Sequence, residues 1–323
     1  MAHELTFNGL TGKAEMAYAN AVPWHGLGQK VEANAPIEEW MVQGGLNWNI
    51  ERSVAQFTNG SLRDYPAFLV LHRSDTHEPL SIVSKDYKVV QPKAMLEFYR
   101  GLVETSGFSI ETVGTLKGGR RIWALAKTNA ESDIVGNDNV KGYLLLVTSC
   151  DGSLATTAQF TSVRVVCNNT LGMSLAQEKD KVKVRHSSVF NPTAVKAELG
   201  LMAQSTFDSF VDRMKRLSDI KVDQAMADRF VRSIISAKGD EEEVRKSKGY
   251  TTVMGLFQGA GRGATMDGVK GTAWGFLNAV TEYADFHIRA QSSENRLNSS
   301  WFGSGAAMKN AALDLLESQA YRV

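Results

Sequence analysis

The sequence has few cysteines and prolines, two and six respectively in 323 residues. Cys150 and Cys167 are expected near opposite ends of two paired strands, too far apart for a disulfide, so we expect two small buried thiols in a reducing cytoplasm. The chain contains no run of about eighteen apolar residues, and it does not open with a charged and then apolar segment. We therefore expect neither a membrane span nor a secretion signal.

An excess of charge of one sign is also lacking. Lysine and arginine number 36 against 35 acidic residues, and 43% of the residues are hydrophobic. This balance is typical of a soluble globular protein and argues against a binder driven by a basic tail. Any attraction to nucleic acid has to come from local clustering of basic side chains. No internal repeat is present, which excludes solenoids and propellers.

A predicted hairpin is the most informative feature that is present. Tyr143 to Thr148 is a short β-branched run, Asp151-Gly152 is typical of a tight turn, and a second alternating run reaches Val166. Asn168 or Asn169 can then cap a helix. The order strand, hairpin, strand and helix predicts an α+β fold with an antiparallel core.

The remaining pattern predicts two domains, an α+β core with the central hairpin over residues 1–190 and a helical region with a glycine-rich loop over residues 191–323. In the first, helices are expected over 36–43 and 92–104, and strands over 48–57, 67–73, 80–90, 110–113, 121–127 and 182–186. In the second, helices are expected over 192–217, 222–237, 274–289 and 306–319.

The glycine-rich stretch 259–265 is flexible enough to wrap an anion with its backbone amides, and Arg262 and Lys270 add positive charge. It does not match a nucleoside-triphosphate loop, because no Gly-Lys-Ser/Thr follows at the required spacing. The two open interpretations are a phosphate or nucleic-acid contact and a mobile surface loop.

Two patterns suggest a metal, and each has a plainer explanation. Asp86-Tyr87-Lys88, with Asp64 and Asp75 upstream, has the acid-x-lysine form of some metal-dependent nucleases. The plainer interpretation is that Asp86 caps a turn and Lys88 is solvated. His72 and His77 bracket Asp75, but their spacing forces no shared ligand geometry. We therefore predict no catalytic residue, no metal site and no cofactor.

Basic residues interleave with the hairpin region and could line one groove beside the returning strand. The expected phosphate contacts are Arg164, Lys183, Arg185 and Arg262, and Trp24 or His25 could stack on bases. A scattered solvated face is the alternative, because acidic residues lie among the basic ones.

Four segments together resemble a known family: Val22-Pro23-Trp24-His25-Gly26-Leu27-Gly28, Tyr87 to Pro92, Arg164 to Leu171, and Gly271 through Ala306. In this order they resemble the phage/plasmid-like proteins that carry domain of unknown function 932. The resemblance implies a setting on phages, plasmids and integrative elements. It supplies no catalytic residues.

The predicted element order is also similar to the core of the Rad52-like annealing proteins, with its β-β-β-α arrangement. We therefore expect a non-catalytic, oligomeric protein that binds single-stranded DNA and promotes annealing. The alternatives are a metal-dependent nuclease centred on Asp75, Asp86 and Lys88, and an interaction protein that blocks a host defence complex.

Overall fold

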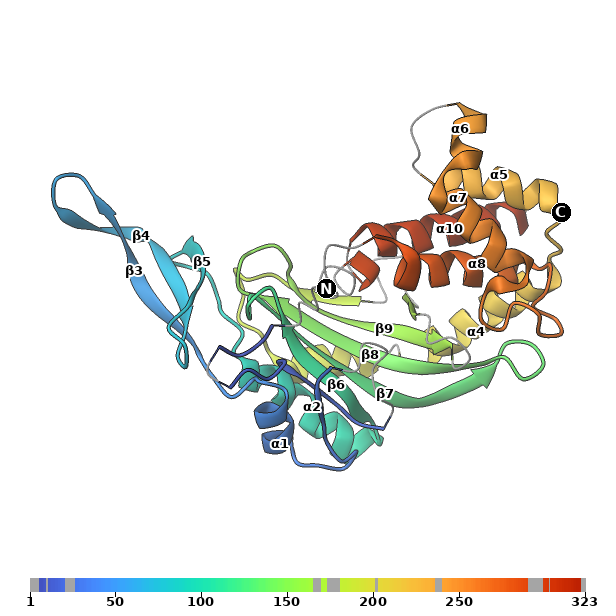
Figure 1. Cartoon of the computed structure of the whole chain (residues 1–323). Coiled ribbons are helices and arrows are strands. Elements are labelled where there is room, and N and C mark those ends of the chain that lie inside the picture. Colours follow the sequence, from blue (N-terminus) through green and yellow to red (C-terminus); the bar gives the residue numbers. More distant parts are fainter. Residues whose placement is uncertain are drawn as a thin grey trace. The chain divides into compact units, whose positions relative to one another are not determined.

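The computed structural model describes residues 6–9, 11–20, 27–164, 170–172, 181–200, 203–235, 240–289, 299–301 and 303–320. The protein is a mixed α+β structure with a large sheet and a helical C-terminal half (Figure 1). It divides into two compact units. Unit 1 comprises Met1–Asn129, Leu144–Gln159 and Lys181–Leu201, and unit 2 comprises Ala130–Tyr143, Phe160–Asp180 and Met202–Val323.

The large sheet has eight strands in the order β10-β9-β8-β7-β6-β1-β2, and β11 also pairs with β9. Strands β6 to β9 follow one another in sequence, so the centre of the sheet is a meander. The strands are β1 (Met16–Tyr18), β2 (Gln29–Lys30), β6 (Ser109–Leu116), β7 (Arg121–Asp133), β8 (Asn139–Ser149), β9 (Thr156–Arg164), β10 (Thr170–Gly172) and β11 (Lys181–Val184).

The predicted central hairpin is confirmed, with β8 and β9 joined through Asp151 and Gly152. Gly152 has a φ of 72°, which an L side chain rarely adopts, and the Asp151 carboxylate accepts the Ser153 backbone N–H at 2.9 Å. The Thr148 and Thr156 hydroxyls lie 2.7 Å apart across the two strands. The turn and the cross-strand pair together fix the register.

Three helices of unit 1 pack beside strands of this sheet. They are α1 (Ile37–Gln43), α2 (Pro92–Ser106) and α3 (Pro192–Gly200). Helix α2 begins at a proline and ends at Gly107, whose φ is 66°. The Tyr99 hydroxyl of α2 is fully buried and hydrogen-bonds to the carbonyls of Ala124 at 2.8 Å and Leu144 at 3.1 Å. These contacts fasten α2 to β7 and β8.

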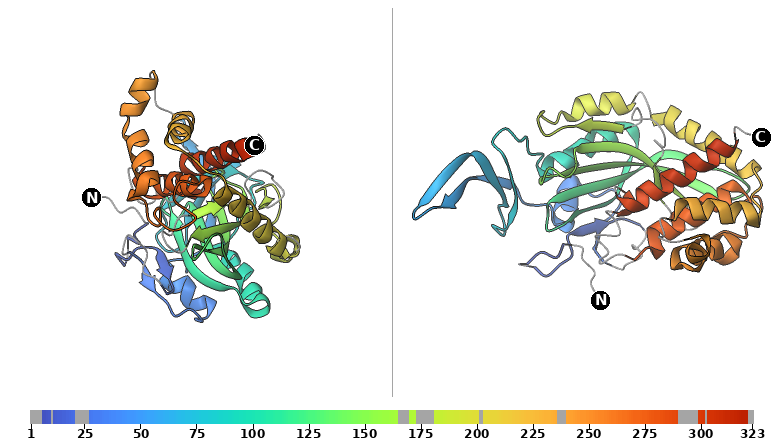
Figure 2. Two further views of the ribbon diagram at one scale, coloured as in Figure 1. Left: turned by 90° about the vertical axis from the view of Figure 1, so that its right-hand side faces the viewer. Right: turned by 90° about the horizontal axis from the view of Figure 1, so that it is seen from above.

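A second, three-stranded antiparallel sheet in unit 1 consists of β3 (Ile50–Thr58), β4 (Leu62–Arg73) and β5 (Pro79–Ser84). Its β3–β4 hairpin projects away from α1 and α2 (Figure 1, and the right-hand view of Figure 2). A register shift between Val54 and Ala55 interrupts the pairing of β3 with β4.

Unit 2 is mainly helical and is organised around α8 (Ala273–Glu282), all of whose residues are buried. Several helices begin at a side-chain cap, and Thr272 caps α8 by accepting the Gly275 N–H. The other elements are α4 (Ala203–Asp219), α5 (Gln224–Ile234), α6 (Glu241–Lys246), α7 (Lys248–Gly255), the π-helical turns η2 (Leu256–Ala260) and η3 (Tyr283–His287), and α10 (Ser304–Ala320).

Two predicted helices differ from the structure. Residues 170–172 form the edge strand β10, not a helix capped by Asn168 or Asn169, because Thr170 to Gly172 pair with Val163 to Thr161 of β9. The expected helix over 192–217 is present as α3 and α4, with residues 201–202 between them outside the described part.

Cys150 is confirmed as a buried free thiol, and burial raises its pKa to about 12, which keeps it protonated and unreactive. Cys167 lies outside the described residues. No helix within the described ranges has the length and apolarity that crossing a membrane requires.

Tyr99→Phe should lower the free energy of unfolding by about 1–3 kcal/mol, because the change removes the hydroxyl that joins α2 to two strands. Denaturant unfolding of the full chain measures this effect. Tyr65→Phe is the matched control, since Tyr65 is 50% exposed, and it should unfold like the wild type. Equal stability of Tyr99→Phe and wild type would mean that the buried hydroxyl does not fasten the helix.

Candidate nucleic-acid interface

Two of the predicted phosphate contacts lie in unit 1. Lys183 belongs to β11, and Arg185 is the first residue after that strand. Both side chains are exposed. The neighbouring His186 is structural, because its ring nitrogens lie 3.0 Å from the carbonyls of Lys88 and Leu154. The ring also stacks on Tyr87 at 4.5 Å, which holds the end of β11 in place.

The other predicted contacts are placed elsewhere or are not described. Arg262 is exposed in unit 2, and Arg164 ends β9 in the same unit with its side chain outside the described part. Trp24 and His25 also lie outside the described residues. Because these contacts are divided between the units, the single groove stays a prediction.

Several backbone amides of the glycine-rich stretch already have acceptors within the chain, since Gly261 donates to the Leu256 carbonyl and Ala264 to the Gly261 carbonyl, each at 3.1 Å. Residues 256–260 form the turn η2, and the backbone N–H of Arg262 donates to the Glu282 carboxylate at 2.9 Å. The Arg262 guanidinium lies 5.4 Å from the centre of the Phe286 ring. A carboxylate of the chain itself therefore occupies one amide that the sequence suggested for phosphate.

Among the described residues, Asp64, Asp75 and Asp86 do not form a group of three metal-ligating side chains. Asp75 accepts two hydrogen bonds from Arg73, at 2.9 and 2.8 Å, and Lys88 donates its backbone N–H to the His186 carbonyl at 2.7 Å. Within the described ranges, Glu51, His72 and His77 are the one group of three metal-ligating side chains that lie within reach of each other. The sequence suggested the two histidines, but with Asp75 and not Glu51.

An exposed aromatic surface lies on the three-stranded sheet. Phe57, Tyr65 and Phe68 are 48%, 50% and 37% exposed, and we call these three residues the aromatic face. The Phe57 and Tyr65 rings meet edge to face at 6.3 Å, and Tyr65 contacts Phe68 at 5.2 Å. The rings thus form one continuous surface on the projecting hairpin.

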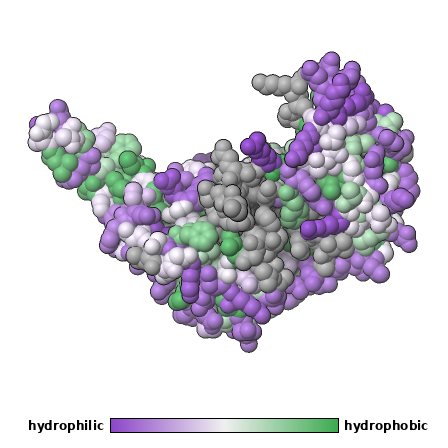
Figure 3. All heavy atoms as spheres, in the orientation of Figure 1, coloured by the Kyte–Doolittle hydropathy of each residue, from purple (hydrophilic) through white to green (hydrophobic). Residues whose placement is uncertain are grey.

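Further exposed apolar side chains lie on the same three-stranded sheet. Of the ten exposed large hydrophobic residues in the described ranges, six belong to the three-stranded sheet. Figure 3 shows hydrophobic residues along this hairpin. Proteins rarely gather exposed apolar groups in one place without a binding role. The six are Val54, Phe57, Leu62, Tyr65, Phe68 and Ile82.

A cation lies beside the aromatic face. Arg63 is directly opposite Phe57 in the β3–β4 register and is exposed, whereas the exposed Arg52 lies five positions from Phe57 on β3 and therefore points to the other face of the sheet. The nearby Asp64 carboxylate accepts a hydrogen bond from the Gln56 amide at 2.7 Å. Aromatic rings beside a guanidinium group are typical of surfaces that stack on nucleic-acid bases and contact their phosphates.

Sequence reasoning did not identify the aromatic face. A signal for it was present: Phe57 and Tyr65 flank Asn59-Gly60, a dipeptide typical of hairpin turns, and Gly60 has a φ of 72°. Aromatic residues on both sides of such a turn, with polar neighbours, indicate a hairpin with an exposed aromatic surface.

The hairpin is rooted in unit 1 by a buried ion pair. Arg73, the last residue of β4, is 2% exposed and approaches the two carboxylate oxygens of Glu15 at 2.7 and 3.0 Å. The Thr115 hydroxyl of β6 donates to Glu15 at 2.5 Å. The Trp48 ring lies 4.2 Å from the Arg73 guanidinium carbon, a cation–π contact.

The ion pair determines the charge states around it. Burial acts to lower the pKa of Arg73, but hydrogen bonds to Asp75 and Glu15 outweigh it and raise that pKa. Partial burial acts to raise the pKa of Asp75, and the hydrogen bonds and charge of Arg73 outweigh it and lower that pKa. Arg73 is therefore a permanent cation between two carboxylates.

The family model of a domain of unknown function, DUF932, matches residues 79–301 of the chain. This match covers more than half of the chain. The chain belongs to the DUF932 family. No curated protein and no solved structure matches it.

The DUF932 match begins at Pro79, the first residue of β5. The hairpin of β3 and β4 and the buried partner Glu15 therefore precede the matched region. The aromatic face of this DUF932 chain is accordingly carried by residues outside that region.

A cavity of about 230 Å³ lies beside the ion pair in this DUF932 chain. Glu15, Asp75 and Trp48 line it together with Lys13 and Gln29. Gly45 also lines the cavity and has a φ of 67°. Any other residue at this position would place its Cβ 2.6 Å from the Glu15 Cγ, which is closer than two carbon atoms can approach. The backbone that follows α1 therefore approaches the buried carboxylate too closely for any other residue.

Arg73→Met should lower the free energy of unfolding by about 3–5 kcal/mol, because it leaves Glu15 buried without its cation. Arg73→Met combined with Glu15→Gln should cost less than the sum of the single changes, since the double variant removes both charges. Denaturant unfolding of the wild type, the two single variants and the double variant gives the four free energies of this double-mutant cycle. If the loss of stability in the double variant equals the sum of the losses in the single variants, the two side chains are not directly coupled.

Proposed function

We propose that this chain is a non-catalytic protein that binds single-stranded DNA, promotes strand annealing as a homo-oligomer, and is encoded on a phage, plasmid or similar element. The aromatic face carries the proposal. Three exposed rings on one hairpin, in which Tyr65 contacts both Phe57 and Phe68, with Arg63 directly opposite Phe57, suit unpaired bases.

Stacking supplies the affinity in this proposal, and the basic residues supply a smaller electrostatic part. The net charge is only +1, so general attraction to a polyanion is weak. Each base that stacks on an aromatic side chain contributes about 1–3 kcal/mol, whatever its identity. A surface of this kind binds strands of any sequence, as annealing requires.

The antiparallel meander β6–β9 supports the comparison with annealing proteins through its strands alone, because α2 precedes these strands in the sequence and β10 and β11 follow them. A Rad52-like core remains part of the proposal. So do the remaining phosphate contacts Arg164, Lys183, Arg185 and Arg262, and stacking by Trp24 or His25.

Phe57→Ala, Tyr65→Ala and Phe68→Ala should each weaken binding of a fluorescent single-stranded oligonucleotide by about 5- to 150-fold, which corresponds to the stacking of one base. These side chains are exposed, so the fold should persist. Phe7→Ala is the matched control, because Phe7 is 48% exposed but lies outside the three-stranded sheet. Fluorescence anisotropy measures the affinities.

The same titrations decide between nucleic acid and a second protein copy on the aromatic face. If the triple variant binds the oligonucleotide with wild-type affinity but loses self-association in light scattering, the face is a contact between copies and the stacking proposal is wrong. If binding weakens at unchanged mass, the face contacts bases.

Lys183→Ala combined with Arg185→Ala should reduce the magnitude of the salt slope by roughly 0.7 for each phosphate that the variant no longer neutralises, with no change in base preference. Oligonucleotide titrations at several salt concentrations give this slope. A wild-type slope would show that the two exposed side chains are solvated and do not touch DNA.

Asp86→Ala and Lys88→Ala should leave nucleic-acid binding nearly unchanged, because neither residue lies in the proposed stacking surface. Incubation of labelled DNA with magnesium or manganese tests the alternative. Cleavage that disappears in both variants would favour the nuclease.

A further inference from the structure

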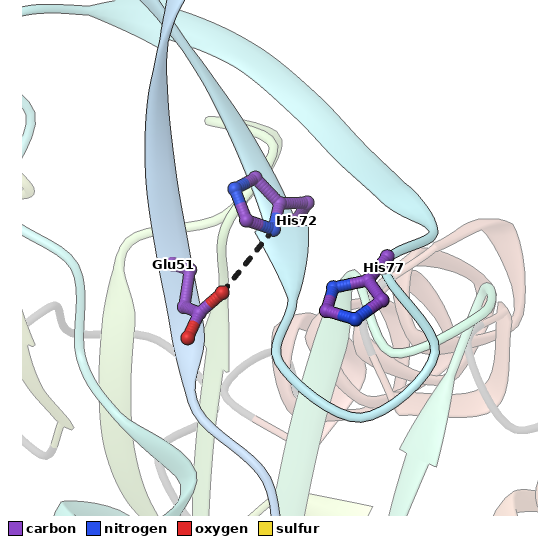
Figure 4. A group of neighbouring side chains, drawn as sticks. All are labelled: Glu51, His72 and His77. Atoms are coloured by element: carbon purple, nitrogen blue, oxygen red, sulfur yellow. Dashed lines mark ion pairs between the residues drawn. The ribbon is translucent and has the colours of Figure 1, made fainter.

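Three side chains of the three-stranded sheet, none of them part of the aromatic face, converge at one place (Figure 4). Glu51 on β3 lies directly opposite His72 on β4 in the strand register, and His77 belongs to the turn between β4 and β5. One potential ligand atom from each residue lies within 4.8 Å of the other two.

The Glu51–His72 distance already matches two ligands of one ion. The Oε2 of Glu51 lies 3.6 Å from the Nδ1 of His72. Zinc bonds of about 2.0–2.1 Å in tetrahedral geometry separate two ligand atoms by about 3.4 Å. The third ligand, His77, is exposed, and one of its ring nitrogens lies within 4.8 Å of a ligand atom of each of the other two residues.

Ser53 orients the His72 ring for this role. Its Oγ lies 2.9 Å from the Nε2 of His72. When Nε2 carries the proton and donates it to Ser53, the lone pair of Nδ1 points toward Glu51. Histidine ligands usually hold their second ring nitrogen in such a hydrogen bond, which fixes both tautomer and orientation.

The backbone holds the turn in one conformation. The His77 N–H donates to the Arg73 carbonyl at 3.1 Å, and the Arg73 N–H donates to the Glu78 carbonyl at 3.1 Å. His77 itself has a φ of 60°, a conformation favoured only by special local structure. The Asp75 carboxylate of the same turn accepts two hydrogen bonds from Arg73, which engage it away from an ion.

We propose that Glu51, His72 and His77 bind a divalent transition metal ion of the zinc class. Two imidazole nitrogens and one carboxylate oxygen favour zinc, nickel or copper over magnesium and calcium, which prefer oxygen ligands alone. Three protein ligands leave a coordination position for water. The site is independent of single-strand binding, since it uses none of the aromatic residues.

The test is calorimetric titration of Zn²⁺ into untagged, chelator-treated full-length protein. The expected result is one ion bound per chain, with no binding of Mg²⁺. Glu51→Gln, His72→Gln and His77→Asn should each weaken zinc affinity at least about tenfold. Asparagine is chosen because it tolerates the positive φ at position 77.

Two further variants separate this site from general histidine binding. His287→Gln alters an exposed histidine of unit 2 and should keep wild-type affinity. Ser53→Ala should weaken binding about tenfold while one ion is still bound, because it removes only the orienting hydrogen bond.

The proposal is overturned if the wild type binds no zinc at micromolar concentration, or if His72→Gln combined with His77→Asn binds it as tightly as the wild type. Thermal unfolding in chelator verifies that each variant is folded. If a histidine variant has a lower unfolding temperature than the wild type, Glu51→Gln replaces it in the comparison. Glu51 is exposed and lies in regular strand backbone, so this substitution should not disturb the fold.

Discussion

The buried contact between Arg73 and Glu15 is the constraint on which unit 1 depends. A charged pair that is 2% and 1% exposed is tolerable only when further groups compensate its loss of water, and here Asp75 and Thr115 add hydrogen bonds and Trp48 adds a cation–π contact. The five residues come from separate parts of unit 1: Glu15 precedes β1, Trp48 precedes β3, Arg73 ends β4, Asp75 lies in the following turn, and Thr115 belongs to β6. One guanidinium therefore joins the projecting hairpin to the large sheet.

The same anchor determines what lies on the opposite face of β4. Successive side chains of a strand point to opposite faces, so a buried Arg73 directs His72 to the other side. There His72 meets Glu51, its partner in the register. A slip by one residue would place Arg73 in solvent without Glu15, at the full cost of an unpaired buried carboxylate. The arrangement of the proposed metal ligands therefore follows from the core.

The sequence predicted those features whose cause is local. The central hairpin follows from Asp151-Gly152 between β-branched runs, and α2 follows from its proline start and apolar stripe. Long-range pairing was not predictable: β10 forms because Thr170 to Gly172 find the edge of β9, which overrides a local helix cap. The Glu15–Arg73 pair spans 58 positions, and no spacing in the sequence indicates it. Glu51 likewise joins His72 and His77 only through strand register.

Exposed aromatic rings on a projecting hairpin also create an aggregation hazard, and the hairpin carries features that reduce it. The register shift at Val54 and Ala55 bends the strand, Pro66 removes a backbone donor from β4, and Arg52 and Arg63 place charge among the apolar groups. Such features oppose pairing through the strand edges but leave the faces of the rings open. The surface is thus suited to partners that stack on it, such as unpaired bases, more than to partners that extend the sheet.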